Sequence, residues 1–167
     1  DIAGVPCFPD IGALPEAPDM AVIALPAAMV NDAVRACQAK GVRAFTVFTS
    51  GFSEMGEAGR ALESRLKADA LAAGSVLCGP NCQGVANFHD RMVANFTSAV
   101  SEDVVAGGGI AFASQSGLFG GIITDECRRR GLGLGYLVST GNEAVVDVAD
   151  VIGYAAADPR TTVIAGY

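Results

Sequence analysis

The segment Ser114-Gln115-Ser116-Gly117 carries the residue types in this chain that are best suited to bind an anion. It follows an apolar, strand-like run that ends at Phe112 and opens a helix-like run. Such a junction gathers free backbone N–H groups, hydroxyl donors and the positive end of a helix dipole at one point. We therefore predict that residues 114–117 bind a phosphate or another anion. The same pattern also fits a plain helix cap by Ser114 or Ser116, and both readings stay open at this stage.

Apolar runs at 20–25, 43–49 and 75–78 are predicted to be strands, and amphipathic runs that end near Gly41 and Gly74 separate them as helices. This alternation predicts a parallel, doubly wound α/β sheet. Ligands of such sheets bind beyond the carboxyl ends of the strands. The candidate site loops are therefore Pro26-Ala27, Ser50-Gly51 and Gly79 to Cys82, although each loop also has a plain reading as a turn.

The glycine triplet 107–109 has the backbone freedom expected of a joint, so we place a domain boundary there and divide the chain into 1–106 and 107–167. The region 84–106 before it lacks a helical period and contains a possible edge strand at 91–96. After the triplet the alternation restarts. The expected elements are strands at 110–113, 134–138 and 161–165, and helices at 117–130 and about 145–157.

The composition excludes several classes of function. The chain has 167 residues, a net charge of -7 and only eleven Lys plus Arg, which argues against a nucleic-acid-binding surface. Its longest uncharged stretches are too short or too broken to span a bilayer, so no membrane role is predicted.

Five cysteines, an odd number, are scattered through the α/β pattern, which predicts free thiols and a reducing cytoplasm. Cys78 and Cys82 have only His89 nearby, so the ligand count for zinc is not met and no metal site is predicted. We expect Cys82, in a site loop, to react faster with thiol reagents than Cys37 and Cys127, which lie at apolar helical positions.

A set of motifs in order along nearly the whole chain resembles the nucleoside-diphosphate-forming acyl-CoA synthetases. This family includes ADP-forming acetyl-CoA synthetase and feruloyl-CoA synthetase, and it is similar to the α subunit of succinyl-CoA synthetase. The motifs are Pro26 after an apolar strand, Thr49-Ser50-Gly51-Phe52, Gly79-Pro80-Asn81-Cys82-Gln83-Gly84, Ser114-Gln115-Ser116-Gly117, Ser139-Thr140-Gly141-Asn142-Glu143-Ala144 and Asp147-Val148-Ala149-Asp150.

The resemblance implies an α/β protein with a Rossmann-like CoA-binding domain followed by a flavodoxin-like parallel α/β domain, both incomplete. It also implies a cytoplasmic, oligomeric acid–CoA ligase that converts a carboxylic acid, CoA and ATP to acyl-CoA, ADP and phosphate through a phosphohistidine. ATP or ADP and Mg²⁺ are expected in an ATP-grasp domain or subunit. A competing hypothesis is a non-catalytic module that binds CoA or acyl-CoA and regulates a protein acetyltransferase.

The resemblance also implies roles for individual residues. The residues expected to bind CoA are Pro26, Phe48, Thr49, Ser50, Gly51, Asn81 and Cys82, and those expected to bind phosphate are Ser114, Gln115, Ser116 and Gly117. The family's first strand and glycine-rich loop are expected before Asp1, and its phosphohistidine motif beyond Tyr167. His89 lies outside that motif, so we predict no catalytic residue in this segment and no catalysis by the segment alone.

Overall fold

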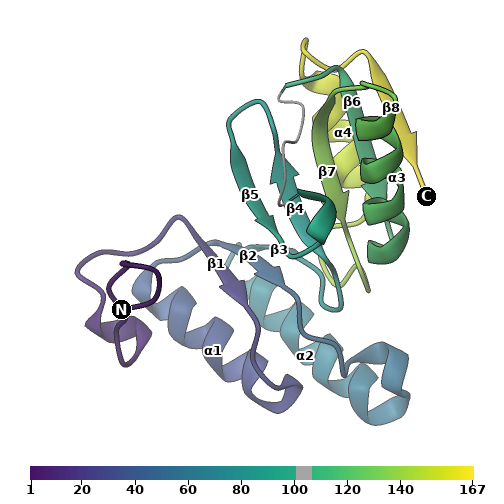
Figure 1. Ribbon diagram of the computed structural model, residues 1–167. Coiled ribbons are helices and arrows are strands. Elements are labelled where there is room, and N and C mark those ends of the chain that lie inside the picture. Colours follow the sequence, from purple (N-terminus) through teal and green to yellow (C-terminus); the bar gives the residue numbers. More distant parts are fainter. Residues whose placement is uncertain (101–106) are drawn as a thin grey trace.

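Two β-sheets organise the residues that the computed structural model describes, 1–100 and 107–167 (Figure 1). The first sheet is parallel and has the order β1-β2-β3, with β1 at Met20–Ile23, β2 at Ala44–Val47 and β3 at Val76–Cys78. Helices α1 (Ala27–Lys40) and α2 (Glu57–Ala72) connect these strands. The expected order of strands and helices is confirmed for this part of the chain.

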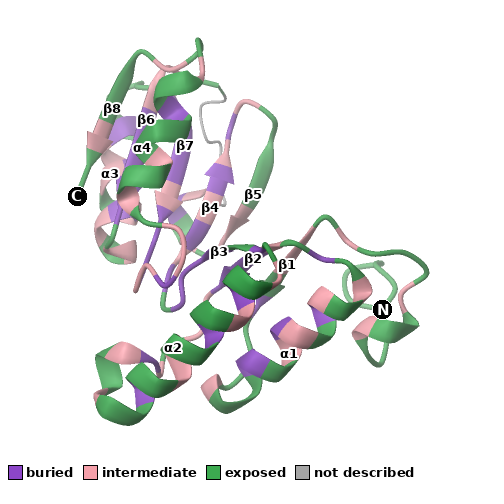
Figure 2. Ribbon diagram, turned by 180° about the vertical axis from the view of Figure 1, so that it is seen from behind, coloured by how far each residue is buried: buried purple, intermediate pink, exposed green. Residues whose placement is uncertain are grey.

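Both helices cover the same face of the first sheet, as Figure 1 shows. The reason is topological: a sheet that grows in one direction through right-handed crossovers places successive helices on one side. These three strands and two helices have the arrangement of one βαβαβ half of a doubly wound sheet. The shared core contains Val30, Val34, Phe45, Leu66 and Leu77, and Figure 2 shows buried residues recurring along both helices.

The second sheet is mixed and has the order β5-β4-β7-β6-β8. Its strands are β4 (Gly84–Asn87), β5 (Met92–Asn95), β6 (Ile110–Ser114), β7 (Leu134–Ser139) and β8 (Val163–Gly166). Strand β6 is parallel to β7 and β8, whereas β4 is antiparallel to β5 and β7. The parallel part matches the expected elements, and β5 matches the possible edge strand expected at 91–96. Strand β4 and its antiparallel pairing with β7 were not predicted.

Two helices cover opposite faces of the second sheet, α3 at Gly117–Arg129 and α4 at Val148–Ala157 (Figure 1). Alternate residues of its strands make this possible. Phe112 and Leu137 pack with Cys127 of α3, whereas Ala111 and Tyr136 pack with Ala155 of α4. Short 3-10 helices lie at Ile11–Ala13, Ser53–Met55 and Ser98–Val100. Within the described residues, no helix has the length and apolar character needed to cross a bilayer.

The strand pairing differs from the division expected at residue 107. Strands β4 and β5 precede the glycine triplet, yet β4 pairs along its length with β7. Pairing partners of strands are set by residues distant in sequence, and the run Gly84–Asn87 is too short to show a clear period of its own. The last residues of the expected first domain, 101–106, lie outside the described residues.

The segment from Thr140 to Val146 joins the two sheets through backbone hydrogen bonds. The amide of Thr140 donates to Ser114 O at 2.8 Å on the second sheet. Beyond it, the amides of Asn142, Ala144 and Val146 donate to the carbonyls of Pro80, Gly79 and Leu77 at 2.8, 3.0 and 3.1 Å, at the end of the first sheet. This segment, which we call the linking segment, fixes the end of β3 beside the end of β6.

Asp147, which follows the linking segment, begins α4 with a capping box. Its carboxylate accepts from the amide of Asp150 at 2.9 Å, and the Asp150 carboxylate accepts from the amide of Asp147 at 3.1 Å. The helix therefore starts at Val148, three residues later than the apolar pattern predicts.

A polar network closes the end of the second sheet that lies away from Ser114. Tyr136 donates to the Asp158 carboxylate, and Arg160 pairs with Asp158 at 2.7 Å and with Asp90 at 3.5 Å. Burial and the hydrogen bond to Asp158 raise the pKa of Tyr136 to about 12. His89 lies in the turn between β4 and β5, half-buried, with its ring 5.5 Å from that of Tyr136.

Two helical glycines should respond in opposite ways to alanine. A Cβ at Gly153 of α4 would meet no atom within 4 Å, so Gly153→Ala should raise the free energy of unfolding by about 0.5–1 kcal/mol. A Cβ at Gly59 of α2 would lie 1.7 Å from Phe52 O, so Gly59→Ala should lower it by about 1–3 kcal/mol. Urea unfolding of both variants measures the difference. Equal effects would show that Phe52 O does not lie against Gly59 in solution.

Candidate functional site

The carboxyl ends of β1, β2 and β3 form one rim, as the parallel arrangement predicts. Thr49 Oγ1 donates to Leu25 O at 2.7 Å, and the amide of Asn81 donates to Thr49 O at 2.9 Å. Gly51 has φ +105°, and a Cβ there would lie 2.9 Å from Ala27 Cβ. The three loops that follow these strands therefore touch one another, and the contact with Ala27 requires glycine at position 51.

The segment 114–117 combines both readings that its sequence allows. Ser116 is the N-cap of α3, and its Oγ accepts from the amide of Phe119 at 3.4 Å. As an acceptor it keeps its own hydroxyl proton to donate. The amides of Gly117 and Leu118 belong to the first helical turn, whose N–H groups have no acceptor within the helix. Anion-binding capacity and helix capping are therefore compatible here.

Ser114 and Gln115 have structural partners. Ser114 is fully buried at the end of β6, and its Oγ donates to Ser116 O at 2.6 Å. Gln115 Nε2 donates to Gly141 O at 3.0 Å, in the linking segment. The Ser114 hydroxyl thus holds the turn that presents Ser116, and Gln115 ties the turn to the linking segment.

The rim loops and the start of α3 enclose a cavity of about 440 Å³, which we call the rim cavity. Its volume lies within the range of small-molecule sites. Its lining holds polar and apolar side chains but no charged one. The residues are Phe48, Ser50, Asn81, Cys82, Gln83, Phe96, Gln115, Ser116, Gly117 and Leu118. An anion in this cavity would be bound by backbone amides, hydroxyls, side-chain amides and the helix dipole, without a neutralising Lys or Arg in the lining.

The rim cavity brings together most of the residues predicted from sequence. Phe48, Ser50, Asn81 and Cys82 come from the predicted CoA-binding set, and Gln115, Ser116 and Gly117 from the predicted phosphate-binding set. The predicted residues that do not line the cavity are Pro26, Thr49, Gly51 and Ser114. Pro26 is exposed as the N-cap of α1, and the other three hold the loops in place.

Sequence reasoning missed Gln83, Phe96 and Leu118 in the lining. Gln83 lies within the Gly79–Gly84 motif and could have been included on that ground. Phe96 follows β5, and its ring centroid lies 4.9 Å from that of Phe48. No local signal identifies Phe96, because only the pairing of β4 with β5 brings it to the rim.

The two sulfur atoms near the rim are buried. Cys82 is only 3% exposed, less than Cys37 at 7% and Cys127 at 8%, so the expectation of a more accessible Cys82 is wrong. Its thiol donates to Val47 O at 3.3 Å, and the Cys78 thiol donates to Ser139 O at 3.2 Å. A hydrogen bond with Cys82 and burial raise the pKa of the Cys78 thiol. Both thiols are therefore buried donors whose hydrogen bonds hold the end of β3 and the loop after it against β7 and β2.

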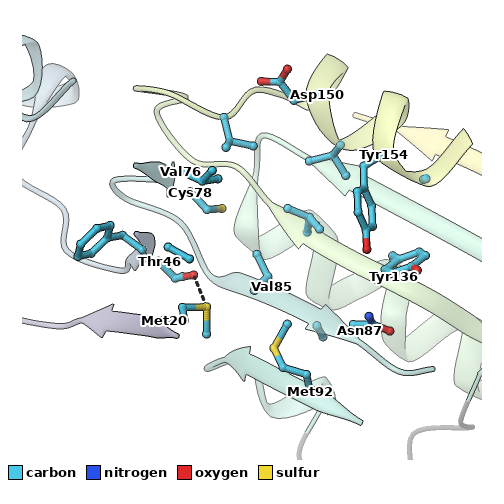
Figure 3. Close-up of a pocket in the computed structure, with 17 residues that line it drawn as sticks. Met20, Thr46, Val76, Cys78, Val85, Asn87, Met92, Tyr136, Asp150 and Tyr154 are labelled. Carbon is cyan, nitrogen blue, oxygen red and sulfur yellow. Dashed lines mark hydrogen bonds between the residues drawn. The ribbon is translucent and has the colours of Figure 1, made fainter. Parts of the chain in front are cut away.

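A second cavity, of about 380 Å³, lies between the two sheets and is apolar (Figure 3). Met20, Thr46 and Val76 line it from the face of the first sheet that carries no helix. Met92 and Tyr154 line it from the hairpin β4–β5 and from α4. None of the residues that line it is predicted to bind a ligand, and none belongs to α3. Its lining shares none of the polar donors that line the rim cavity.

Comparison with known proteins identifies both halves of the chain. A family model described as "CoA binding domain" matches residues 1–87, and one described as "Succinyl-CoA ligase like flavodoxin domain" matches residues 107–167. The chain is 40% identical over 167 residues to "Acetate--CoA ligase [ADP-forming] I" of Archaeoglobus fulgidus, covering 100% of this chain and 24% of that protein. It is 32% identical over 167 residues to "Acetate--CoA ligase [ADP-forming] II subunit alpha" of Pyrococcus furiosus, covering 100% and 35% respectively.

A solved structure has the same fold. It is the dinucleotide-forming acetyl-coenzyme A synthetase 1 of Ca. Korarchaeum cryptofilum in complex with phosphate and ADP, which aligns with a TM-score of 0.91 and 33% identity. The alignment covers 100% of this chain and 35% of that one. The chain thus spans about a quarter to a third of the length of the relatives it matches.

Burial predicts how the thiols react. Cys7 is exposed and the other four cysteines are buried, so maleimide should label the native chain first at Cys7. In a Cys7→Ser variant, labelling should become slow, with Cys82 no faster than Cys37 or Cys127, as read by mass spectrometry of digested samples. Fast labelling of Cys82 in that variant would show that the loop from Gly79 to Cys82 opens in solution.

Proposed function

We propose that this chain supplies the sites where CoA and phosphate meet in an ADP-forming acid–CoA ligase. The premise is that the chain belongs to the ADP-forming acyl-CoA synthetases, as its CoA-binding domain and its relatives show. The parent protein would interconvert a carboxylic acid, CoA and ATP with acyl-CoA, ADP and phosphate. The observation that carries this proposal is the rim cavity. Loops assigned to CoA and a helix start assigned to phosphate, on separate grounds, line the same cavity.

The residues of the rim cavity fit two reacting groups held side by side. The Ser116 hydroxyl and the first amides of α3 would bind phosphate oxygens as they develop charge. Ser50, Asn81 and Cys82, which line the same cavity, would flank the thiol end of CoA. Attack of the CoA sulfur on an acyl phosphate breaks the bond from the carbonyl carbon to the phosphate oxygen. Donors at Ser116 and α3 would stabilise the phosphate that leaves.

Other parts of the parent would complete the reaction. We assign to them a phosphohistidine and an ATP-grasp domain or subunit that binds ATP and Mg²⁺. We also propose that the parent is an oligomeric cytoplasmic enzyme, and that residues 1–106 and 107–167 act as a CoA-binding and a phosphate-binding part. In the second reading, a regulatory CoA-binding module, the parent would bind CoA without forming a phosphoenzyme.

Replacing Ser116 separates anion binding from capping. A hydrogen bond to a charged group contributes about 1.5–3 kcal/mol, so Ser116→Ala in the full-length parent should slow phosphoenzyme formation by about ten- to a hundredfold. CoA affinity should change little. The lost cap should lower the free energy of unfolding by about 1 kcal/mol. Rapid-quench phosphorylation, calorimetric CoA binding and thermal melting measure the three effects.

Asp147→Ala is the matched control, because Asp147 caps α4 and is not in the rim cavity. It should lower stability by a similar amount while phosphoenzyme formation stays normal. Normal phosphorylation in Ser116→Ala would refute the phosphate site. A wild-type parent that binds CoA but forms no phosphoenzyme would favour the regulatory module.

Gly51 tests the CoA-binding loops. Because Gly51→Ala adds a Cβ 2.9 Å from that of Ala27 at φ +105°, it should displace the loop and raise KM for CoA about tenfold in the full-length parent. Gly74→Ala is the control: it has φ +62° but no atom within 4 Å of the added Cβ. That variant should lose about 1 kcal/mol of stability and keep its KM for CoA. The same KM in both variants as in wild type would remove Gly51 from the CoA site.

A further inference from the structure

Asn142 of the linking segment bridges two carboxylates from the first sheet's side of the rim. Its Nδ2 lies 2.6 Å from Glu54 Oε2 and 2.8 Å from Glu63 Oε2. Its Oδ1 accepts from Asn81 Nδ2 at 3.2 Å, and its amide donates to Pro80 O at 2.8 Å. A half-buried side chain with partners on three separate segments is positioned to hold them in register.

The two carboxylates in turn hold the backbone of the loop assigned to CoA. Glu54 Oε1 accepts from the amides of Gly51 and Phe52, and Glu63 Oε2 accepts from the amide of Ser53 at 3.1 Å. Burial raises the pKa of Glu54, but the hydrogen bonds from Asn142 and the loop amides outweigh it and hold the pKa below its usual value. Glu54 is therefore ionised at neutral pH and accepts from both the loop and Asn142.

The linking segment connects Asn142 to the phosphate-binding segment on its other side. Thr140 donates its amide to Ser114 O at 2.8 Å, and Gln115 donates to Gly141 O at 3.0 Å. Hydrogen bonds and the covalent backbone of residues 140–142 thus connect the turn of Ser116, through Asn142, to the amides of residues 51–53.

We propose that Asn142 is a positioning residue, which sets the CoA-binding loop at the correct place relative to the phosphate-binding helix start. This inference rests on the proposed function. The amide is suited to the role because its NH₂ group donates to both carboxylates while its oxygen accepts from Asn81. Aspartate is nearly the same size, but it would place a third carboxylate beside Glu54 and Glu63 and repel them.

The test uses the full-length protein and the variants Asn142→Asp and Asn142→Ala. KM for CoA should rise about ten- to thirtyfold in Asn142→Asp, and by a smaller factor in Asn142→Ala, because the charge-assisted bonds to the glutamates are lost. CoA-independent phosphoenzyme formation should stay within about twofold of wild type, since the bonds that hold Ser116 do not involve this side chain. Normal phosphorylation also shows that the variants are folded.

Hydrogen exchange gives a readout that does not depend on activity. The amides of residues 51–53 should exchange about tenfold faster in Asn142→Asp, because their carboxylate acceptors are no longer held. Asn87→Ala is the matched control, since Asn87 Nδ2 donates to Asp90 at 2.7 Å in the β4–β5 turn, away from the rim cavity. It should change neither KM for CoA nor exchange at residues 51–53.

The outcomes separate this inference from the proposed function. An active wild type with unchanged KM for CoA in both Asn142 variants overturns the positioning role and leaves the function standing. Faster exchange without a change in KM also overturns it, because Asn142 would then only stabilise the loop. A wild-type parent that neither binds CoA nor forms a phosphoenzyme overturns the proposed function and the positioning role with it.

Discussion

The backbone hydrogen bonds of the linking segment are the constraint on which the rest of the site depends. Amides from Thr140 to Val146 donate to carbonyls of Ser114 and of residues 77–80, so one short segment is hydrogen-bonded to the ends of both sheets. Gly141 makes the approach possible, since a Cβ there would lie 2.3 Å from Pro80 O. Together with the bond from the Cys78 thiol to Ser139 O, this pairing fixes the separation between the start of α3 and the end of β3, and with it the shape of the rim cavity.

The rim cavity derives its polarity from dipoles held by this framework. Its lining has no charged side chain, and the groups that could bind an anion are amides and hydroxyls fixed by secondary structure. Such groups need little reorganisation when charge develops, which is the condition under which hydrogen-bond donors stabilise a transition state most. The carboxylates Glu54 and Glu63 stand behind the loop and hold its backbone. The two carboxylates thus hold the loop in place, whereas uncharged groups line the rim cavity itself.

The two cavities lie in different structural settings. The rim cavity lies where strands end and helices begin, and the apolar cavity lies against the face of the first sheet that has no helix. Parallel sheets are usually covered on both faces, and here part of that cover comes from the β4–β5 hairpin and α4 of the second sheet. The same antiparallel hairpin brings Phe96 to the rim. The β4–β5 hairpin of the second sheet thus contributes a side chain to the rim cavity at the strand ends of the first sheet.

Local signals in the sequence determined much of the fold. The strands at 20–23, 44–47 and 76–78, the helices between them, the left-handed cap at Gly41 and the N-cap at Ser116 all follow from patterns spanning a few residues. Hydrophobic period, helix capping and turn formation involve residues within about four positions of each other. A short stretch of sequence therefore contains both partners of each interaction. The motifs at the strand ends likewise placed most of the candidate site residues at one rim.

Only the tertiary structure decided how distant segments pair. The partner of β4, the burial of Cys82 and the bridge made by Asn142 each depend on residues more than thirty positions away. A strand pattern shows that backbone groups need partners but leaves their identity open, because any strand of matching length and faces can provide them. The sequence by itself therefore determined most of the elements and the loops that line the rim cavity. Packing between the sheets decided which side chains those loops present.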